Sequence, residues 1–560
     1  MQRVIGKGTW LDKVAHILVE RERRLGRDLS LIRVESGLGA SGIPHIGSLG
    51  DAVRAYGVKL ALENLGYKGE LIAYSDDMDG LRKVPHGLPE WLKEYIAMPV
   101  CNIPDPFTCH SSYAMHMSSM LMDALDKLSI QYRFQSGHEA YKQGLLNKEI
   151  DILLRNAKVI GERIAELVGQ EKFKQILPYF PICSNCKRIY LAQAYEYVED
   201  EHKVLYECKG GIIGREYVQG CGYKGEADVF KAEGKLSWKV EFAARWSALS
   251  IRFEAYGKDI MDSVKVNDWV ADNILNYAHP LHVRYEMFLD KSGRKISKSA
   301  GNVFTPQVWL RYGTAQSLML LLFKRIAGTR HVGVEDIPRL EDEYDRLEDT
   351  YFNSRIDISS SPSPPSSLSS TSTTTATSTT TASADTMKLI KQRGIYEYIN
   401  HNKPPSRAGE HVPYMLLAQL AAVAVEGKEV EYVLNRLRAY GMLKGSDEIS
   451  ERLRERIFKA RLYAIEVLQQ RPESKAASLD ERQRKAIEDL IQVISSNDDA
   501  KVIQSSIFDT ARRHGIEPRE FFRLLYMLLI GTDYGPRLGP YIIDVGRDNV
   551  IKMLKRHLAM

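Results

Sequence analysis

Cysteine is scarce in this sequence, with 6 residues in a chain of 560. So few thiols exclude a fold held together by a dense disulfide network. Long apolar runs are also absent. The longest, 414–425 and 521–530, fall short of the roughly 20 apolar residues that a membrane-spanning helix needs. The sequence therefore predicts a protein with hydrophobic cores and no membrane association.

An excess of charge of one sign is also missing, because 77 Lys and Arg residues face 72 Asp and Glu residues, for a net charge of +5. Proteins that coat DNA carry a stronger basic excess. We therefore expect no DNA partner, although a local basic patch could still bind a nucleic acid. Residues 1–10 lack the patterns of a secretory signal and of a transit peptide, which predicts a cytoplasmic location.

Residues 359–385 contain almost no large aliphatic or charged side chains; Leu368 and Asp385 are the exceptions. A Ser/Thr/Pro-rich segment of this kind cannot bury a core, so it predicts a flexible tether between folded parts. A glycosylated stalk of similar composition fits less well, since nothing else indicates secretion. A length of 560 residues also exceeds the roughly 250–300 residues that one core reaches.

The two sides of this tether differ in pattern. Before it, a strand-like run at 29–34, an amphipathic stretch at 48–65 and a second apolar run at 70–74 predict a parallel α/β sheet with right-handed crossovers. After it, apolar residues recur at three- and four-residue spacing, which predicts an all-helical part. Between about 178 and 225, cysteine pairs and short β-prone runs predict a small insertion in the α/β domain.

Residues Gly37 to Gly42 match the G-x-G-x-x-G pattern and follow a predicted strand, and an acidic pair ends the next strand. This pattern favours a dinucleotide-dependent oxidoreductase. However, Pro44 to Ser48 (PHIGS) follow the triplet, so the loop is longer than that fingerprint allows. A histidine just before a helix, here His45, can instead donate to phosphate oxygens, or it can simply cap the helix.

A second polar loop spans residues 291–302 (KSGRKISKSAGN). Two lysines that alternate with two serines provide cationic and hydroxyl donors suited to a polyphosphate. Alone, such a charge run most often forms a solvated surface. Together with residues 44–48, it resembles the HIGH and KMSKS signatures of class I aminoacyl-tRNA synthetases, whose loops close over ATP from opposite sides of a Rossmann sheet.

Longer strings in family order resemble the class I lysyl-tRNA synthetases. They are VESG at 34–37, SDDMDGLRKVP at 75–85, IPDPF at 103–107, CHSSY at 109–113, WKVE at 238–241, ARW at 244–246, FEAYGKD at 253–259 and GPRLG at 535–539. The resemblance implies an α/β Rossmann-type catalytic domain with a parallel sheet and a small zinc-binding α+β insertion, followed by an all-α anticodon-binding domain. The expected boundaries are 1–177 and 236–325 for the two catalytic halves, 178–235 for the insertion, 326–358 for a helical connector, 359–386 for the tether and 387–560 for the anticodon-binding domain.

The resemblance also implies an activity, lysine--tRNA ligation. Lysine reacts with ATP, accompanied by Mg²⁺, to give lysyl-adenylate and pyrophosphate, and the lysyl group then passes to tRNA(Lys). In-line attack on the α-phosphate depends mainly on positioning and charge stabilisation. The implied catalytic residues are His45, Ser48, Lys295 and Lys298, and the implied ATP-binding residues are these four with Asp259, Ser297 and Ser299.

The implied pocket for L-lysine comprises Gly37 and Gly39 for the amino-acid end, Asp51 and Tyr285 for the ε-ammonium, and Trp238 for the alkyl stem. Both aromatic residues could instead be core residues, and Asp51 could be an acid favoured in a first helical turn. The family usually has Thr, Glu and His where this chain has Gly39, Asp51 and Ile260. These departures leave open a paralogue that activates another amino acid.

Four cysteines, Cys183, Cys186, Cys208 and Cys221, can supply the thiolates of a tetrahedral structural zinc site. Cys101 and Cys109 lack such spacing, and we expect them to be structural. A zinc-containing tRNA-binding protein without enzymatic activity is a further alternative, but it gives the ATP motifs no use. In the helical part, arginines could contact tRNA; candidates are Arg438, Arg512, Arg513, Arg523 and Arg537.

Overall fold

The computed structural model describes residues 5–214, 216–294, 296, 304–326, 328–354, 384–443, 449–468 and 479–558. Most of the predicted tether lies outside these residues, as do Lys295, Ser297, Lys298 and Ser299. The chain forms two compact units. Unit 1 comprises 1–307, 319–333 and 355–404, and unit 2 comprises 308–318, 334–354 and 405–560.

Unit 1 is built on a five-stranded sheet in the order β12-β11-β1-β2-β3, in which every neighbouring pair is parallel. The predicted parallel α/β fold is thereby confirmed. The strands are β1 (Ile32–Leu38), β2 (Gly69–Ser75), β3 (Arg133–Ser136), β11 (Ile251–Gly257) and β12 (Leu281–Tyr285).

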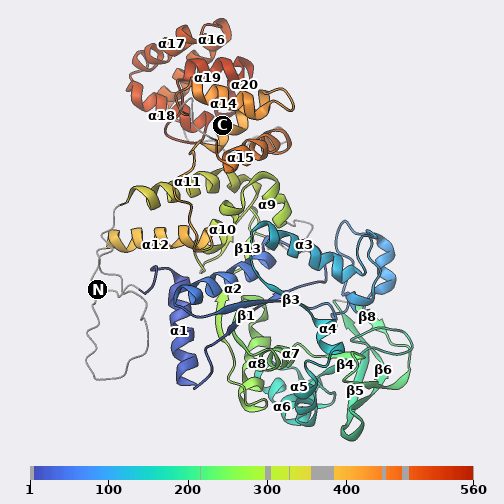
Figure 1. Ribbon diagram of the computed structural model, residues 1–560. Helices are drawn as coiled ribbons and strands as arrows, with labels where there is room; N and C mark the ends of the chain where they lie inside the picture. The colour runs from blue at the N-terminus through green and yellow to red at the C-terminus, as the bar shows by residue number, and fades with distance from the viewer. Residues whose placement is uncertain are drawn as a thin grey trace, which may run out of the picture. The chain divides into compact units, whose positions relative to one another are not determined.

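The first strand starts later than its apolar residues predict. Asp28 accepts hydrogen bonds from the backbone and hydroxyl of Ser30, which holds this stretch in a turn, and β1 pairs with β2 only from Ile32 to Leu38. A sheet covered on both faces has strands that are buried on both sides. Helices α1 (Trp10–Arg24) and α2 (Ile46–Asn64) lie on one face, and α7 (Glu241–Ala248) and α8 (Met261–Asn273) lie on the other (Figure 1).

The sheet order reverses direction between β1 and β11. In open parallel sheets, ligands bind at the carboxyl ends of the strands where the order reverses. The loop 39–45 leaves β1 at this point, and the 3-10 turn η5 (Lys258–Ile260) leaves β11. The topology thus brings the loop 39–45 and Asp259 to the same edge of the sheet.

Helix α2 is buried along most of its length, with 14 buried residues among its 19. It packs against β1, β2 and β11 and against α1. At Gly57 an added Cβ atom would lie 2.7 Å from the ring of Phe323 and 2.8 Å from Leu11. Glycine at this position lets α1 and the chain near Phe323 approach α2 closely, which fixes the helix in the core.

The insertion consists of short strands and is closed at its base by the antiparallel pair β4–β10. Its elements are β4 (Tyr179–Pro181), β5 (Ala192–Val198), η4 (Glu199–Glu201), β6 (Lys203–Cys208), β7 (Gly210–Ile213), β8 (Glu216–Gln219), β9 (Lys224–Asp228) and β10 (Gly234–Leu236). Between β2 and the insertion the chain forms η1 (Glu90–Tyr95), η2 (Val100–Asn102), α3 (Tyr113–Lys127), α4 (Gly137–Lys142), α5 (Asn147–Arg155), α6 (Ala157–Val168) and η3 (Glu171–Lys174).

Helix α12 (Ala384–Ile399), which follows the Ser/Thr tract, packs within unit 1. Tyr398 donates a hydrogen bond to Asp12 (2.6 Å), and the hydroxyl of Tyr56 on α2 lies 2.8 Å from Nδ1 of His401. The chain therefore contacts the sheet domain again before it returns to unit 2 at residue 405. The predicted domain limits follow composition and the units follow packing, so those limits stay predictions.

All the regular secondary structure in the described residues from 405 onward is helical, which confirms the predicted helical character of the C-terminal part. They are α13 (Tyr414–Val423), α14 (Glu429–Ala439), α15 (Glu451–Tyr463) with the π-turn η7 (Ala464–Leu468), α16 (Glu481–Ser496), α17 (Ala500–Arg513), α18 (Pro518–Leu529), α19 (Leu538–Val545) and α20 (Arg547–Leu558). Before α12, the chain also forms β13 (Phe288–Leu289), α9 (Pro306–Tyr312), α10 (Ala315–Phe323), β14 (Arg330–His331), η6 (Val334–Asp336) and α11 (Ile337–Asn353).

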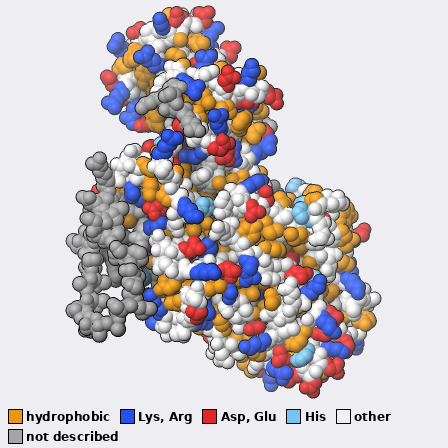
Figure 2. Space-filling view, viewed as in Figure 1, with side chains coloured by type: hydrophobic (Ala, Val, Ile, Leu, Met, Phe, Trp, Pro, Cys, Tyr) orange, Lys and Arg blue, Asp and Glu red, His pale blue; other side chains and the backbone are white. Residues whose placement is uncertain are grey.

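Helix α11 belongs to unit 2. Fully buried Arg456 of α15 joins it through Glu341 (3.2 Å) and Asp345 (2.9 Å). On the face shown in Figure 2, basic and acidic side chains are interspersed, in line with the small net charge. None of the described helices is long and apolar enough to cross a membrane.

Candidate functional site

His45 is the N-cap residue of α2. Its Nδ1 accepts hydrogen bonds from the backbone N–H groups of Gly47 (3.1 Å) and Ser48 (3.3 Å). A neutral imidazole that accepts at Nδ1 carries its proton on Nε2. The two interpretations of His45 are therefore compatible, because the ring caps the helix with one nitrogen and keeps a donor on the other.

Gly47 is required by this cap. An added Cβ atom at Gly47 would lie 2.8 Å from both Nδ1 and Cε1 of His45, so a larger residue would displace the imidazole. The next backbone group is also fixed, since the N–H of Ile46 donates to the carbonyl of Phe304 (2.9 Å). The start of α2 is thus held by its own cap and by the chain that follows the second polar loop.

The described residues on both sides of 297–303 are held by backbone hydrogen bonds. Ile296, which is 3 % exposed, donates its N–H to the carbonyl of Phe288 (3.3 Å), and Phe304 is bonded to the start of α2. The described residues that flank 297–303 thus lie on unit 1, one of them at the helix start that His45 caps. The four residues predicted in this loop lie outside the described residues, so their roles stay predictions.

Three further predicted residues, two for the amino acid and one for ATP, flank the reversal of the sheet order. Gly37 lies in β1 beside Tyr74 of β2, and Gly39 follows the strand. Asp259 lies in η5, directly after β11. An added Cβ atom at Gly257 would lie 2.7 Å from the carboxylate of Asp259, so the glycine leaves room for that side chain.

Asp51 and Tyr285, both predicted to bind an ammonium group, meet in the structure. The hydroxyl of Tyr285, at the end of β12, donates a hydrogen bond to the carboxylate of Asp51 on α2. Burial raises the pKa of Asp51 well above its ordinary value, Arg54 opposes this rise, and the charges of Asp259 and Glu254 add to it. The charge of Asp259 reaches Asp51, so the predicted nucleotide and amino-acid regions adjoin.

Trp238 has a different neighbourhood. Its indole N–H donates to Asp79 (3.0 Å), a carboxylate that also pairs with Lys235 (2.6 Å). Within the described residues, no hydrogen bond or ring contact joins Trp238 to Asp51 or Tyr285. The structure therefore brings together two of the three side chains predicted to surround the lysine side chain.

Arg54 is a further residue of this site that no sequence motif indicated. Its side chain is 1 % exposed, and Nη1 lies 3.8 Å from the carboxylate of Asp51. The guanidinium carbon lies 4.2 Å from the ring centre of Tyr285. The only sequence signal was an acid and a base at i and i+3 on a helix, a spacing that is common on helix surfaces.

A buried cation, Arg245 of α7, joins three strands beneath this site. It pairs with Glu35 of β1 (2.9 Å), with Asp76 after β2 (2.7 Å) and more distantly with Glu254 of β11 (3.9 Å). Burial raises the pKa of Glu35 to about 8, and the charge of Arg245 opposes that rise. Arg245 thus offsets the mutual repulsion of two carboxylates within neighbouring strands and of a third at the carboxyl end of β2.

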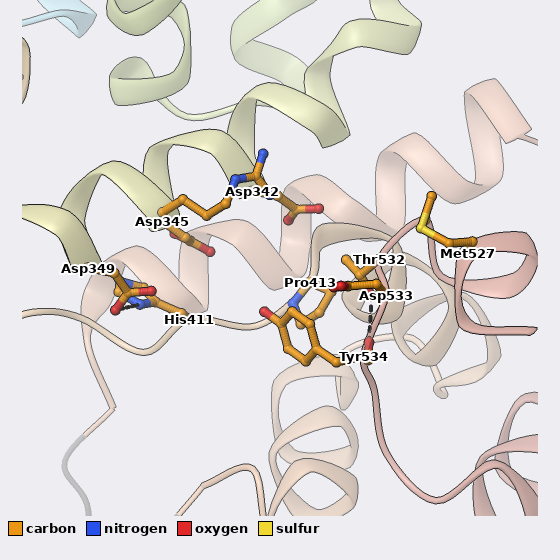
Figure 3. A pocket seen from close by; sticks show the side chains of 11 residues that line it. Asp342, Asp345, Asp349, His411, Pro413, Met527, Thr532, Asp533 and Tyr534 are labelled. Atoms are coloured by element: carbon orange, nitrogen blue, oxygen red, sulfur yellow. Dashed lines mark hydrogen bonds and ion pairs between the residues drawn. The ribbon is translucent and has the colours of Figure 1, made fainter. Parts of the chain in front are cut away.

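A separate cavity of about 250 Å³ lies within unit 2. Figure 3 shows three aspartates along α11, Asp342, Asp345 and Asp349, on one side and Tyr534 on the other. His411 bridges Asp349 (2.9 Å) and Glu348 (2.7 Å). None of the residues predicted for catalysis lines this cavity, and its carboxylates would repel a phosphate, so it is not a nucleotide site.

The four predicted metal ligands converge in the insertion. The Sγ atoms of Cys183 and Cys221 lie 3.6 Å apart, and those of Cys186 and Cys208 lie 3.8 Å apart. All four lie within 4.8 Å of one another. Ligands about 2.3 Å from a tetrahedral zinc are about 3.8 Å apart, whereas a disulfide needs about 2.05 Å. The four side chains therefore fit a metal ion and do not form disulfides.

A second group of possible metal ligands comprises Asp105, Cys109, His110 and His116. Cys109 Sγ lies 3.2 Å from Nδ1 of His110 and 3.3 Å from Nδ1 of His116, and the latter nitrogen lies 3.2 Å from Asp105. The prediction that Cys109 is a structural cysteine did not include this group, because cysteine spacing alone does not indicate ligands of mixed type. The spacing Asp-x₃-Cys-His-x₅-His carried the signal.

We expect both groups to bind zinc, and purified protein to contain about two zinc ions per chain by elemental analysis. Cys186→Ala and His116→Ala should each remove about one, because each takes one of four ligands from a separate group. Cys101→Ala, which belongs to neither group, is the control. Equal zinc content in His116→Ala and the unchanged protein would contradict the second site.

Known proteins resemble this chain over its full length. A family model described as "tRNA synthetases class I (K)" matches residues 8–371. A lysine--tRNA ligase of Cenarchaeum symbiosum (strain A) is 49% identical over 558 residues, covering 100% of both chains. A lysine--tRNA ligase of Methanocaldococcus jannaschii is 29% identical over 97% of this chain and 98% of its own.

Further relatives are bacterial. A lysine--tRNA ligase of Rickettsia bellii (strain OSU 85-389) is 29% identical over 94% of this chain and 93% of its own. Among solved structures, a glutamate-tRNA synthetase from Elizabethkingia anophelis has 13% identity and a TM-score of 0.34, covering 94% of this chain and 100% of that one. That likeness is too weak to add to the assignment. The sequence relatives and the family model confirm the predicted resemblance, and the chain belongs to the class I lysyl-tRNA synthetase family.

Proposed function

We propose that this chain is a lysine--tRNA ligase. In the first step, a carboxylate oxygen of lysine attacks the α-phosphorus of ATP, giving lysyl-adenylate and pyrophosphate. In the second, a hydroxyl of the 3′-terminal ribose of tRNA(Lys) attacks the activated carbonyl and AMP leaves. The observation that carries the proposal is the position of the His45 cap at the reversal of the sheet order, with the Asp51–Tyr285 pair on and beside the same helix.

The start of α2 is the proposed phosphate site. A helix N-terminus attracts anions through its N–H groups and dipole, and His45 adds a donor at Nε2. As charge shifts toward the leaving pyrophosphate, a fixed donor stabilises the transition state more than the substrate. We assign Asp259, across the reversal point, to the ribose hydroxyls of ATP, from which a carboxylate can accept hydrogen bonds.

The second polar loop supplies the remaining phosphate contacts in this proposal. Family resemblance assigns Lys295, Ser297, Lys298 and Ser299 to the triphosphate, with the lysines balancing charge on the departing pyrophosphate. ATP enters as its Mg²⁺ complex. The anchors at Ile296 and Phe304 support the assignment, because they keep both flanks of the loop on unit 1, one of them at the His45 cap.

The amino-acid site is proposed at Asp51 and Tyr285. A carboxylate and a phenolic oxygen can accept hydrogen bonds from an ε-ammonium group. Gly37 and Gly39 lie at the end of β1, where small residues let the α-amino and carboxylate groups approach the backbone. Trp238 is assigned to the alkyl stem by resemblance alone.

For tRNA, we propose that the zinc-bearing insertion contacts the acceptor stem and that the helical part binds the anticodon. The metal would be structural, since four cysteines leave no open position for a substrate. Among the candidate arginines of the helical part, the side chains of Arg512, Arg513 and Arg523 are 70%, 61% and 59% exposed. Exposed arginines can pair with phosphates and stack on bases.

The dinucleotide alternative has less support. In that fingerprint the helix begins within the glycine triplet, whereas α2 begins at Ile46, after Gly42 and Pro44. A tRNA-binding protein without enzymatic activity would have no use for the His45 cap or for Asp259. A paralogue that activates another amino acid remains a specific alternative, because Gly39 and Asp51 both alter the predicted pocket.

An amino-acid panel in an ATP–pyrophosphate exchange assay tests the proposal. We expect exchange with L-lysine, because an acidic pocket accepts the ammonium and rejects neutral or acidic side chains, which would cover the exposed side of Asp51 without supplying a cation. L-Arginine and L-ornithine are the informative competitors, since each carries its cationic group at a different distance from the α-carbon than lysine does. Exchange with another amino acid and not with lysine would support the paralogue instead.

Gly47→Ala should lower kcat for exchange by about 100-fold, the typical effect of losing one transition-state donor. The new methyl group would push the His45 imidazole from its cap position, so the Nε2 donor would move as well. Gly66→Ala, beyond the end of α2, tests for a general effect of a glycine change. An unchanged kcat in Gly47→Ala would show that the His45 geometry does not matter for the chemistry.

Asp51→Asn should raise KM for lysine by about 10- to 100-fold, since a hydrogen bond to a charged group contributes about 1.5–3 kcal/mol and about 1.36 kcal/mol is one decade. KM for ATP should stay within about threefold. Steady-state exchange with each substrate varied in turn measures both constants. If lysine saturation were unchanged, the ammonium site would have to lie elsewhere.

A further inference from the structure

Arg54 occupies an unusual position for a cation. It lies one helical turn after Asp51 on α2, and its side chain is 1 % exposed. In the described part of the chain, its Nε and Nη1 atoms have no hydrogen-bond partner. Burying a guanidinium group without full hydrogen bonding costs stability, so its retention in the core points to a use.

The contacts of Arg54 converge on the proposed ammonium site. Its guanidinium lies over the ring of Tyr285 at 4.2 Å and 3.8 Å from the carboxylate of Asp51. A cation over an aromatic face is attracted by the ring and restricts its position. An added Cβ atom at Gly50 would lie 2.8 Å from Nη1 of Arg54, so the glycine provides the space that the guanidinium fills.

The two sides of the Asp51 carboxylate differ in accessibility. The side chain of Asp51 is 26% exposed, whereas that of Arg54 is 1 % exposed. Arg54 therefore approaches the carboxylate from the interior of the protein. The exposed side stays available for a second cation, and a carboxylate with two oxygens has enough lone pairs for both.

We propose that Arg54 is a positioning residue for substrate recognition: its buried guanidinium supplies the counter-charge and ring contact that fix Asp51 and Tyr285, so that the exposed side of Asp51 binds the substrate ammonium. This inference rests on the proposed function. Arg54 does not touch the substrate in this scheme. It acts through the two side chains that do.

The charges around Asp51 explain why a counter-charge is needed. Arg54 faces it from α2, Tyr285 from β12, Glu254 from β11 and Asp259 from η5. Burial and both acidic neighbours raise the pKa of Asp51, and Arg54 is the group that lowers it. Without Arg54 the pKa of Asp51 would rise further, and a carboxyl group that is neutral attracts an ammonium only weakly.

Removal of Arg54 should also make lysine binding depend on pH. Loss of Arg54 raises the pKa of Asp51 further, so lysine binding should be weakest at low pH and recover as rising pH ionises the carboxyl group. The useful range runs from about pH 6.5 to about pH 8.5, below the ordinary lysine pKa of about 10.4, so that the substrate ammonium keeps its charge. A purely structural role for Arg54 predicts no such recovery.

The experiment compares Arg54→Met, Arg54→Lys, Asp51→Asn and the Arg54→Met/Asp51→Asn double variant in ATP–pyrophosphate exchange across this pH range. Arg54→Met should raise KM for lysine about tenfold or more near pH 7 and less at pH 8.5, with KM for ATP within about threefold. Arg54→Lys keeps a cation and should stay close to the unchanged protein. Lys59→Met removes another buried α2 cation, paired with Glu63 at 2.7 Å, and is the matched control.

The double variant shows whether Arg54 acts through Asp51. If it does, Arg54→Met adds little to Asp51→Asn, whereas independent residues would give multiplied effects on KM. Should Arg54→Met not fold, as judged by thermal unfolding, Arg54→Gln compared with Arg54→Lys provides the same contrast.

Three results would overturn the inference: an unchanged KM for lysine, equal rises in KM for lysine and ATP, or a loss that is constant with pH and additive with Asp51→Asn. The exchange activity of the unchanged protein shows whether this inference alone is wrong or the proposed function is wrong as well. If it exchanges with lysine while Arg54→Met is unaffected, only the role of Arg54 is wrong. If it shows no lysine-dependent exchange, the proposed function is wrong and this inference is wrong with it.

Discussion

The burial of α2 is the constraint on which the rest of the candidate site depends. With 14 of its 19 residues buried, the helix cannot turn or slide without breaking contacts with three strands and α1. It carries His45 at its first end and Asp51 farther along, and a rise of about 1.5 Å per residue separates these positions by about 9 Å along the axis. One rigid element therefore sets the spacing between the proposed phosphate and ammonium sites.

The electrostatics of the site follow from the sheet topology. Glu35 and Glu254 are register partners on neighbouring parallel strands, and Asp76 directly follows β2, so the three carboxylates converge and repel one another. Arg245, fully buried on α7, is their shared counter-charge. Removing one partner of such a buried pair leaves an uncompensated charge at a cost of about 3–5 kcal/mol. This pairing lets the sheet carry a set of acidic side chains close to the site proposed for an anionic nucleotide.

Local pattern was enough to predict the strand–helix–strand unit around α2, the helical C-terminal part and the four cysteines, because each depends on residues close in sequence. The packing of α12 was not predictable in this way, since Tyr398 and its partner Asp12 are 386 positions apart. The Asp105 group was missed although its spacing is local, because its donors are of mixed type. Arg54 was missed because burial, not spacing, distinguishes it from an ordinary helix-surface ion pair.

The contacts of Arg54 suit the shorter acidic residue at position 51. The family usually has Glu there, one methylene longer than Asp. A shorter side chain holds its carboxylate closer to the α2 backbone, where the guanidinium of Arg54 and the hydroxyl of Tyr285 reach it. The space that a longer acid would fill is then open on the exposed side. A lysine ammonium could enter that space directly, or a water molecule could bridge it at little cost in affinity, so the shorter acid is compatible with a pocket for lysine.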